Sequence, residues 1–491
     1  MDYRILFIGA TWLLLGVLTL YRLVTKSMTE TRAVFLLIAA GFLLRLFYVL
    51  YTPVTLRQHD VYSFSGAKGH AGYIMYFYEH LRLPDFSPDS VSQFYHPPLH
   101  HFLEALWMRL QTTLGLSLET AAENTQLLTL LYSSLCLPVL WKNLRLLRLS
   151  GRALLIPLAI FCFHPSFIIM AGSINNDMLM TLLTLTAVMC ALRWYQAPSV
   201  RRILPIALTL GLAMSAKFSA SLAAPAIGLL FLMRFVSDLT QNPGPVRRKL
   251  VKQYLGQFGL FLLVCCPLGL WWTLYSYFVW DVPFGYVPSL SLTSHQYIGD
   301  YPLWRRFIIT PDQLSSVYLA WADQPGFNYN EYNMITGFLK TSVFDESVLF
   351  RPEAVTGFRQ LLSWAGAFFS VVLFYSNFLL ALISAAAIVY CLVRRLRLND
   401  SAVTLSMVVL GGFVLLSYIS FCLGYPHTCT QNFRYAIPTL PTGGAFLGRF
   451  LQEADRRRTS ALSRGAATFI TLLTLVFCIS SAAVYILLGM V

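Results

Sequence analysis

The residues whose types suit catalysis begin directly after the second long apolar run, where a polar loop opens. Asp60 lies near the start of this loop, with Arg57 and His59 close by. Nearby positive charge favours the ionised form of a carboxylate, so Asp60 is a candidate general base at a membrane surface. The alternative for a lone acid in such a loop is a solvated side chain with no role in chemistry.

A second group of ionisable residues surrounds the start of a predicted helix in the same loop. The prolines at 97–98 suit a first helical turn, and helical sequence follows them. His96, His100 and Glu104 are spaced at i, i+4 and i+8, so one helix face could present them to a metal ion. The prolines place His96 outside the regular helix, however, and no H-E-x-x-H motif occurs. The other interpretation is that these histidines bond water and lipid phosphate.

Three further charged residues lie at the ends of later apolar runs. Asp177 ends the segment GSINND, where its ordinary role would be to cap the next helix. Lys217 lies between two apolar runs, a costly place for a lysine unless it reaches outward or pairs with an anion. Arg434 precedes Tyr435 in a late polar segment, and its planar guanidinium suits two phosphate oxygens. One carboxylate with several cations beside a bilayer suits a substrate that is part lipid, part phosphate and part polar group.

The elements that must position these residues are membrane-spanning helices. Of the 491 residues, 57% are hydrophobic and 12% are charged, a composition that excludes an ordinary soluble enzyme. Runs of roughly 17–25 mostly apolar residues can cross a bilayer. Twelve such runs are predicted, at 4–21, 33–51, 122–140, 153–171, 177–195, 203–216, 219–235, 255–275, 363–391, 403–423, 433–451 and 467–489.

The distribution of charge assigns the loops to the two sides of the membrane. The net charge is +14, and most of the lysines and arginines fall in six short loops, at 22–32, 142–152, 193–202, 234–252, 394–397 and 449–464. Basic loops mark the cytoplasmic side. The outer side then receives the other polar segments, at 52–121, 172–176, 276–362 and 424–432. The basicity is thus a topology signal, and we expect no nucleic-acid partner.

In their order and their sidedness, these residues resemble the GT-C superfamily of membrane glycosyltransferases. The shared elements are an acid just after an early span, a first outer loop ending in an aromatic-His-Pro-Pro-Leu element, an Asn-Asp turn, a Leu-Ala-x-x-x-Lys element and a late Phe-Arg-Tyr. The likeness covers residues 33–240 and the segment 424–440. Within the superfamily, the sequence resembles the branch of protein O-mannosyltransferases and aminoarabinose transferases, together with bacterial proteins of that type.

The resemblance implies a fold, a division of the chain and a location. The fold would be all-α and polytopic, a GT-C fold with about 12 transmembrane helices and two long outer loops that carry short interfacial helices. Residues 1–32 would form an extra N-terminal transmembrane helix, 33–240 the catalytic module with the first outer loop 52–121, and 241–491 a C-terminal region with the outer loop 276–362. The protein would be a multi-pass plasma-membrane protein with its active site on the extracytoplasmic side.

Members of this family transfer a sugar from a polyprenyl-phosphate carrier to an acceptor hydroxyl, with inversion at the anomeric carbon. By this resemblance Asp60 is the base that takes the acceptor proton. The residues implied to bind the donor phosphate are Lys217, Arg434, His96 and Arg57, and those implied to order the acceptor or the first loop are Asp177, His59, Tyr95 and Tyr435. The implied partners are a polyprenyl-phosphate sugar (on undecaprenyl phosphate for a bacterial source), a glycan, lipid or protein acceptor, and membrane lipid.

Two departures from the family pattern change what is expected. The first outer loop has no Asp-x-Asp, so the pattern of the metal-dependent oligosaccharyltransferases is absent and no cofactor is expected to be required; a divalent metal stays an open alternative. His59-Asp60 stands where protein O-mannosyltransferases commonly have Asp-Glu, which weakens the expectation of a protein acceptor. The loop 276–362 contains WADQPGFNYNEYN, which suits stacking on sugar faces, or else forms a packed cap on the cavity.

Two other classes of function compete with sugar transfer. Secondary transporters commonly have twelve spans, but they generally have short loops, broken helices in both halves and ionisable groups near the midplane. This sequence instead has two long loops and no visible half-repeat. A membrane-embedded metal-dependent hydrolase would use His96, His100 and Glu104.

Overall fold

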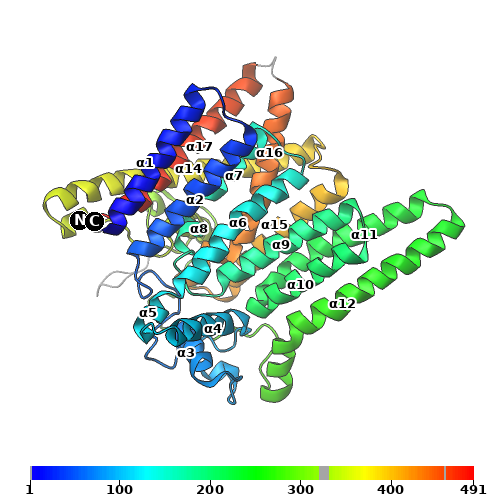
Figure 1. Cartoon of the computed structure of the whole chain (residues 1–491), viewed down its shortest axis with the longest axis horizontal. Helices are drawn as coiled ribbons and strands as arrows, with labels where there is room; N and C mark the ends of the chain where they lie inside the picture. The colour runs from blue at the N-terminus through cyan, green and yellow to red at the C-terminus, as the bar shows by residue number, and fades with distance from the viewer. Residues whose placement is uncertain (1–2, 320–330, 458–460) are drawn as a thin grey trace.

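The computed structural model describes residues 3–319, 331–457 and 461–491. In these ranges the regular structure is helical, and the β-type pairing is a single bridge between Tyr297 and His427. The long helices lie side by side in a bundle, and the short helices α3, α4 and α5 gather at one end of it (Figure 1). The expectation of an all-α protein is confirmed.

The helices have the following bounds. The long ones are α1 (Tyr3–Val24), α2 (Glu30–Tyr51), α6 (Gln126–Leu146), α9 (Asp177–Gln196), α10 (Val200–Ala216), α11 (Ala224–Gln241), α12 (Gly244–Trp280), α14 (Gly357–Val393), α15 (Ser401–Gly424), α16 (Leu440–Arg456) and α17 (Ala461–Leu487), and α7 (Arg152–Phe163) is a shorter helix that packs among them. The shorter ones are α3 (Gly69–His80), α4 (Leu99–Thr113), α5 (Leu118–Glu123), α8 (Pro165–Ile169), α13 (Met334–Phe344) and the 3₁₀ helices η2 (Phe218–Ala223), η6 (Thr428–Gln431) and η7 (Phe433–Thr439).

Nine helical segments of the described ranges are long and apolar enough to cross a membrane, so the chain is a multi-pass membrane protein. The predicted count of twelve is not confirmed. The predicted runs at 153–171, 203–216 and 433–451 correspond to helices that are short or broken. The first of these breaks at His164, because Pro165 cannot continue the hydrogen bonding of α7 and instead starts α8.

The outer segments predicted from charge meet at one end of the bundle. The Gln58 amide donates to the Gly172 carbonyl at 2.7 Å, which ties the first outer loop to the turn 172–176. The Ile298 backbone N–H donates to the Pro426 carbonyl at 2.9 Å, which ties the loop 276–362 to the segment 424–432. The contact of His59 Nε2 with Asp345 Oδ2 at 2.6 Å links the first outer loop to the loop 276–362, so the four segments are in contact, independently of which side of the membrane they face.

The basic loops meet one another as well. Arg145 forms an ion pair with Glu30 at 2.6 Å, which joins the loops 142–152 and 22–32. The Gln452 amide donates to the Arg148 carbonyl at 3.1 Å, which brings in the loop 449–464. Successive helices carry the chain from one end of the bundle to the other. The basic loops therefore lie at the opposite end from the catalytic candidates, one helix length away.

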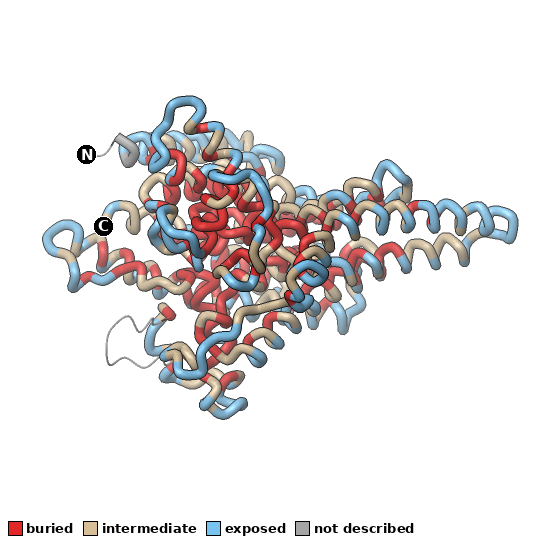
Figure 2. The backbone as a smooth tube through the Cα atoms, turned by 90° about the horizontal axis from the view of Figure 1, so that it is seen from below, coloured by how far each residue is buried: buried red, intermediate tan, exposed pale blue. Residues whose placement is uncertain are grey.

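Burial is concentrated in the middle of the bundle, while the hairpin of α11 and α12 extends outward with largely exposed surfaces (Figure 2). Lipid is the natural solvent of such surfaces in a membrane protein. The helices α3 and α4 have a separate small core, in which Tyr73, Ile74 and Ala105 are fully buried. The first outer loop is thus a packed unit and presents a stable surface to the bundle.

Gly448 allows α16 to approach α7 closely. A Cβ at this position would lie 2.5 Å from the Ala153 carbonyl oxygen and 2.7 Å from a Leu149 methyl carbon. We therefore expect Gly448→Ala to lower the free energy of unfolding by about 1–3 kcal/mol, the usual cost of overpacking, measured as a lower Tm in detergent.

The matched control for this substitution is Gly443→Ala on the same helix, where the nearest atom would be the Ser384 Cβ at 3.6 Å. Alanine has the higher helix propensity, so this control should leave Tm unchanged or raise it slightly. Equal losses in the two variants would show that close approach at 448 does not matter for stability.

Candidate functional site

A cavity of about 440 Å³ opens at the end of the bundle where the outer segments meet. Its lining includes seven of the nine residues predicted from the sequence to bind substrate or do chemistry. They are Asp60, Tyr95, His96, Asp177, Lys217, Arg434 and Tyr435. The remaining two, Arg57 and His59, lie outside the cavity lining.

The backbone around Asp60 is held from several directions. The preceding Gln58 side chain bonds both to the Gly172 carbonyl and, through its own oxygen, to the Ile174 N–H at 3.1 Å. The Asp60 carbonyl accepts the His70 N–H at 3.0 Å and so caps an otherwise unpaired donor in the first turn of α3. These bonds fix the chain while leaving the Asp60 side chain 47% exposed toward the cavity.

Asp60 also has an unusual backbone conformation, with φ of +53°. Among residues other than glycine, aspartate and asparagine tolerate this left-handed region best. The fit to α3 further depends on Gly69, whose φ is +75° and where a Cβ would lie 2.5 Å from the Asp60 carbonyl oxygen. The local sequence therefore suits the geometry that presents this carboxylate.

Arg434 lies beside Asp60 in the lining of the cavity. Its Nη2 atom lies 3.4 Å from Asp60 Oδ2 and donates to the Tyr435 hydroxyl oxygen at 2.8 Å. Asn432 caps η7, because its side-chain oxygen accepts a hydrogen bond from the Arg434 backbone N–H at 2.9 Å. This bond fixes the backbone from which the Arg434 side chain extends. A carboxylate is thus held beside a guanidinium that stays charged at all relevant pH values.

A second ion pair forms between the start of α9 and the end of α10. Lys217 Nζ lies 2.5 Å from Asp177 Oδ1, and the Asn176 amide donates to the Ala216 carbonyl at 3.0 Å. The alternative role of Asp177, in which its side chain caps α9, does not hold, because Asn176 occupies the N-cap position and the Asp177 carboxylate turns to Lys217. Lys217 keeps donors to spare, since an ammonium carries three N–H groups.

Buried polar atoms without partners point to a polar occupant of this cavity. Among the described residues, Arg434 Nε and Asp177 Oδ2 are buried and have no hydrogen-bond partner. An unsatisfied buried donor on a charged group costs more than about 1–3 kcal/mol. A ligand with anionic oxygens would satisfy the guanidinium, and water or a ligand hydroxyl would satisfy the carboxylate.

Aromatic and imidazole rings form one wall of the cavity. The Trp272 indole N–H donates to the Tyr95 carbonyl at 3.0 Å, which joins α12 to the first outer loop. Burial, with nearby Lys217, lowers the pKa of His96 well below its usual value, so this imidazole is neutral. His96 can therefore donate one hydrogen bond to a phosphate but supplies no charge.

Arg57 lies away from the cavity, contrary to its predicted part in phosphate binding. Its Nε donates to the Tyr48 hydroxyl oxygen at 3.2 Å and its Nη2 to the Thr52 hydroxyl oxygen at 3.0 Å. The guanidinium also lies over the Tyr48 ring, 5.5 Å from its centroid. These contacts make it a tie between the end of α2 and the loop that follows.

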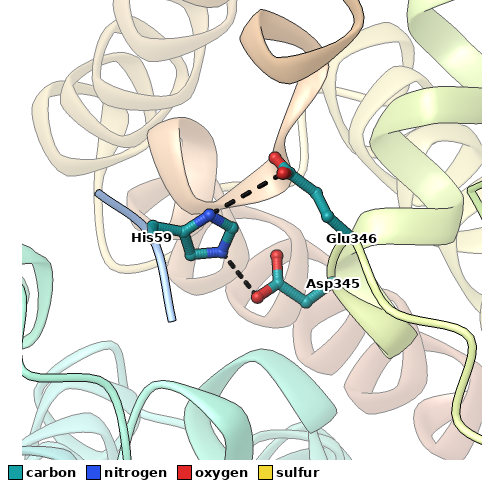
Figure 3. A group of neighbouring side chains, drawn as sticks. All are labelled: His59, Asp345 and Glu346. Atoms are coloured by element: carbon teal, nitrogen blue, oxygen red, sulfur yellow. Dashed lines mark hydrogen bonds and ion pairs between the residues drawn. The ribbon is translucent and has the colours of Figure 1, made fainter. Parts of the chain in front are cut away.

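The second predicted residue outside the cavity, His59, points the opposite way from Asp60. Its ring lies between Asp345 and Glu346, which follow α13 (Figure 3). The chain bends at these residues, with a φ of +53° at Asp60, and the two neighbouring side chains separate, one to the cavity and one to the protein behind it.

The alternative metal site on α4 does not assemble. His100 Nε2 donates to the Ile174 carbonyl at 2.9 Å and lies 4.0 Å from Glu104, while His96 faces the cavity. Burial lowers the pKa of His100 to about 4 and raises that of Glu104 well above its usual value. In the described part of the chain, the side chains near enough to share an ion are His59, Asp345 and Glu346.

Several residues of the site were not found from the sequence. Trp272, Gln93 and Tyr286 line the cavity, but in the sequence they look like ordinary residues of a span end or a loop. Part of the predicted sugar-stacking segment WADQPGFNYNEYN, residues 321–330, lies outside the described residues. Its last residues, Glu331 to Asn333, are buried against α13.

Comparisons with known proteins return a structural likeness. No protein-family model matches the chain, and no curated protein sequence matches it. Among solved structures, the chain is similar to the oligosaccharyltransferase of Archaeoglobus fulgidus, tethered to an acceptor peptide containing the NVT sequon (10% identity, TM-score 0.44) and in the apo form (11% identity, TM-score 0.43). Both alignments cover 91% of this chain, which spans about half (55%) of the length of that enzyme.

Proposed function

We propose that this protein is a GT-C-type membrane glycosyltransferase. It transfers a sugar from a polyprenyl-phosphate carrier to an acceptor hydroxyl on the extracytoplasmic face, with inversion of the anomeric centre. The observation that carries the proposal is the cavity itself, where the accessible Asp60 carboxylate shares the lining with Lys217 and lies 3.4 Å from Arg434. A base and two cations beside lipid match the three parts of the reaction.

The reaction needs one bond formed and one broken. The acceptor oxygen attacks the anomeric carbon and loses its proton to Asp60, while the bond from that carbon to the phosphate oxygen breaks. The bond electrons leave with the phosphate, which gains one negative charge. Lys217 and Arg434 stabilise this charge where it develops, the kind of contribution that electrostatic preorganisation makes. A phosphate leaving group that is neutralised in this way needs no general acid, so a single carboxylate suffices.

The parts of the site come from both regions of the chain. Asp60, Asp177 and Lys217 belong to the proposed catalytic module 33–240, whereas Arg434 and Tyr435 belong to the region 241–491. The C-terminal region is thus proposed to complete the active site rather than to serve as a separate domain.

Turnover of the carrier tests the proposal directly. The purified protein in lipid vesicles would be incubated with a panel of polyprenyl-phosphate sugars and candidate hydroxyl acceptors, and mass spectrometry would follow the free polyprenyl phosphate. We expect one donor to be consumed and its sugar to appear on an acceptor hydroxyl with inverted configuration. Chelation should leave the rate unchanged, since cations of the chain face the leaving phosphate.

The same assay separates the competing functions. A secondary transporter would move a substrate across the vesicle membrane without breaking the sugar–phosphate bond. A metal-dependent hydrolase would release free sugar to water and lose activity with chelator. Absence of carrier turnover across the full panel, in a protein that remains folded, would overturn the glycosyltransferase proposal.

A further inference from the structure

A cluster behind the first outer loop joins three segments that are far apart in the sequence. His59 Nε2 lies 2.6 Å from Asp345 Oδ2, and His59 Nδ1 lies 3.8 Å from Glu346 Oε2 (Figure 3). The Asn432 amide nitrogen donates to Asp345 Oδ1 at 2.7 Å and to Glu346 Oε1 at 2.8 Å. The first outer loop, the end of α13 and the segment before η7 therefore meet at these four side chains.

The arrangement is complete with a protonated imidazole and needs no metal ion. The three ionisable side chains come close enough to hold an ion, but the two ring nitrogens face different carboxylates (Figure 3). A metal-bound imidazole gives one nitrogen to the ion, with the other ligands gathered around that nitrogen. Here each carboxylate oxygen instead faces a nitrogen of His59 or Asn432.

We propose that His59, as an imidazolium clamped between Asp345 and Glu346, is a charged latch that holds the first outer loop against the end of α13 and so positions Asp60. Asp345, Glu346 and Asn432 are then positioning residues. They act on the reaction through His59, whose neighbour in the chain is the proposed base. This role in catalysis rests on the proposed function, whereas the latch itself does not.

The latch lies within the same electrostatic network as the cavity. The charged groups that face His59 are Asp345 and Glu346 after α13, Arg434 from η7 and Asp177 from α9, with Asp60 beside it in its own loop. Burial alone would lower the pKa of His59, but Asp345 and Glu346 outweigh burial and Arg434, and the pKa is raised. Likewise burial would raise the pKa of Asp345, but His59 and the Asn432 hydrogen bond outweigh it and lower the pKa.

The sign of the pH dependence follows from the raised pKa of His59. Stabilisation of the latch is fully present below the ordinary histidine pKa of 6.5, and it is lost as the pH rises through the higher value of the folded state. Between those two values the equilibrium for opening the latch should increase by up to about tenfold per pH unit, because one proton is released on opening.

Hydrogen–deuterium exchange of the full-length protein in vesicles tests this without any assumption about activity. The peptides to follow contain His59, Asp345 and Asn432, with exchange corrected for the intrinsic pH dependence of amide exchange and compared with a peptide from α6. We expect the three peptides to lose protection together as the pH rises from 6.5, while the reference peptide does not change. In His59→Gln, exchange of these peptides should be faster at low pH and independent of pH.

Controls keep the result specific to the latch. His80→Gln removes an exposed histidine that neighbours Glu79 at 3.9 Å, and it should leave the pH dependence intact. Asp345→Asn should reduce the dependence while keeping the fold, since asparagine has nearly the shape of aspartate and its side-chain oxygen can still accept the hydrogen bond from the Asn432 amide. A flat pH profile in the wild type, or loss of protection in one peptide alone, would overturn the proposal.

Addition of a metal ion tests the alternative that this cluster is a metal site. If Zn²⁺ or Mn²⁺ at equimolar concentration protected the three peptides at high pH, and Asp345→Asn abolished this effect, the cluster would be a metal site and not an imidazolium latch. Where carrier turnover is measurable, Asp345→Asn should lower kcat with little change in KM. If no donor is turned over, the exchange experiment still decides whether the latch exists.

Discussion

Asp60→Asn is expected to lower sugar transfer by about 10²–10⁴-fold, the range that general-base catalysis usually contributes. Asparagine has nearly the shape of aspartate and tolerates the φ of +53° at this position, so the loop should keep its conformation. It cannot take the acceptor proton, however. The initial rate of carrier release measures the loss, and equilibrium binding of the lipid donor should stay within a few-fold of wild type.

Asp85→Asn is the matched control for this substitution. Asp85 lies in the same outer loop but is exposed and pairs with Arg82 at 3.0 Å. This variant should transfer sugar at the wild-type rate. Full activity in Asp60→Asn, in protein with unchanged Tm, would remove Asp60 from the role of base.

Arg434→Gln is expected to reduce kcat by about 10²–10³-fold, the usual cost of removing one preorganised donor from a developing negative charge. The guanidinium contacts Asp60 and Tyr435 and has a buried Nε without a partner in the described structure. By the proposed function this arginine donates to the leaving phosphate, and the substitution removes that charged donor. Stopped assays of carrier release at saturating donor measure the effect. Arg82→Gln, an exposed arginine of the first outer loop, serves as the control.

The choice of leaving group distinguishes the two roles. A glycosyl fluoride releases fluoride, which is a less basic anion than the phosphate monoester that leaves a polyprenyl-phosphate sugar. The deficit of Arg434→Gln should therefore shrink on this analogue, whereas the deficit of Asp60→Asn should persist because the acceptor proton must still be removed. Equal deficits of both variants on both donors would mean that Arg434 acts on the structure of the site and not on the departing charge.

The sequence could predict that Asp60, Lys217 and Arg434 lie at the same end of the bundle, because this depends only on which side of the membrane each residue lies. Each residue lies at the end of an apolar run, and the alternation of basic loops shows which ends share a side of the membrane. This grouping depends only on the order of the apolar runs and basic loops along the chain, so an error of a few residues in any boundary does not change it. The structure confirms the grouping through the cavity that these residues line.

The latch and the pairing of Asp177 could not be predicted in the same way. Asp345 and Glu346 look like a solvated acid pair after a short apolar helix, and their burial depends on how α13 packs against η7. For Asp177 the sequence offers capping of its own helix as the ordinary role, because capping is a local preference, but Lys217 at the end of the neighbouring helix offers a charged partner at 2.5 Å. Contacts between segments distant in the chain leave no periodic trace in the sequence.

The pairing of Asp60 with Arg434 spans 374 positions of the chain, and this separation has a consequence for biosynthesis. At a translation rate of about 5–20 residues per second, roughly 20 to 75 s pass between the synthesis of the two residues. During that interval the nascent protein already contains Asp60 but lacks the arginine that pairs with it. On the proposed function, a chain that ends before Arg434 should therefore use the lipid-linked sugar at least about 10²–10³-fold more slowly than the full-length protein.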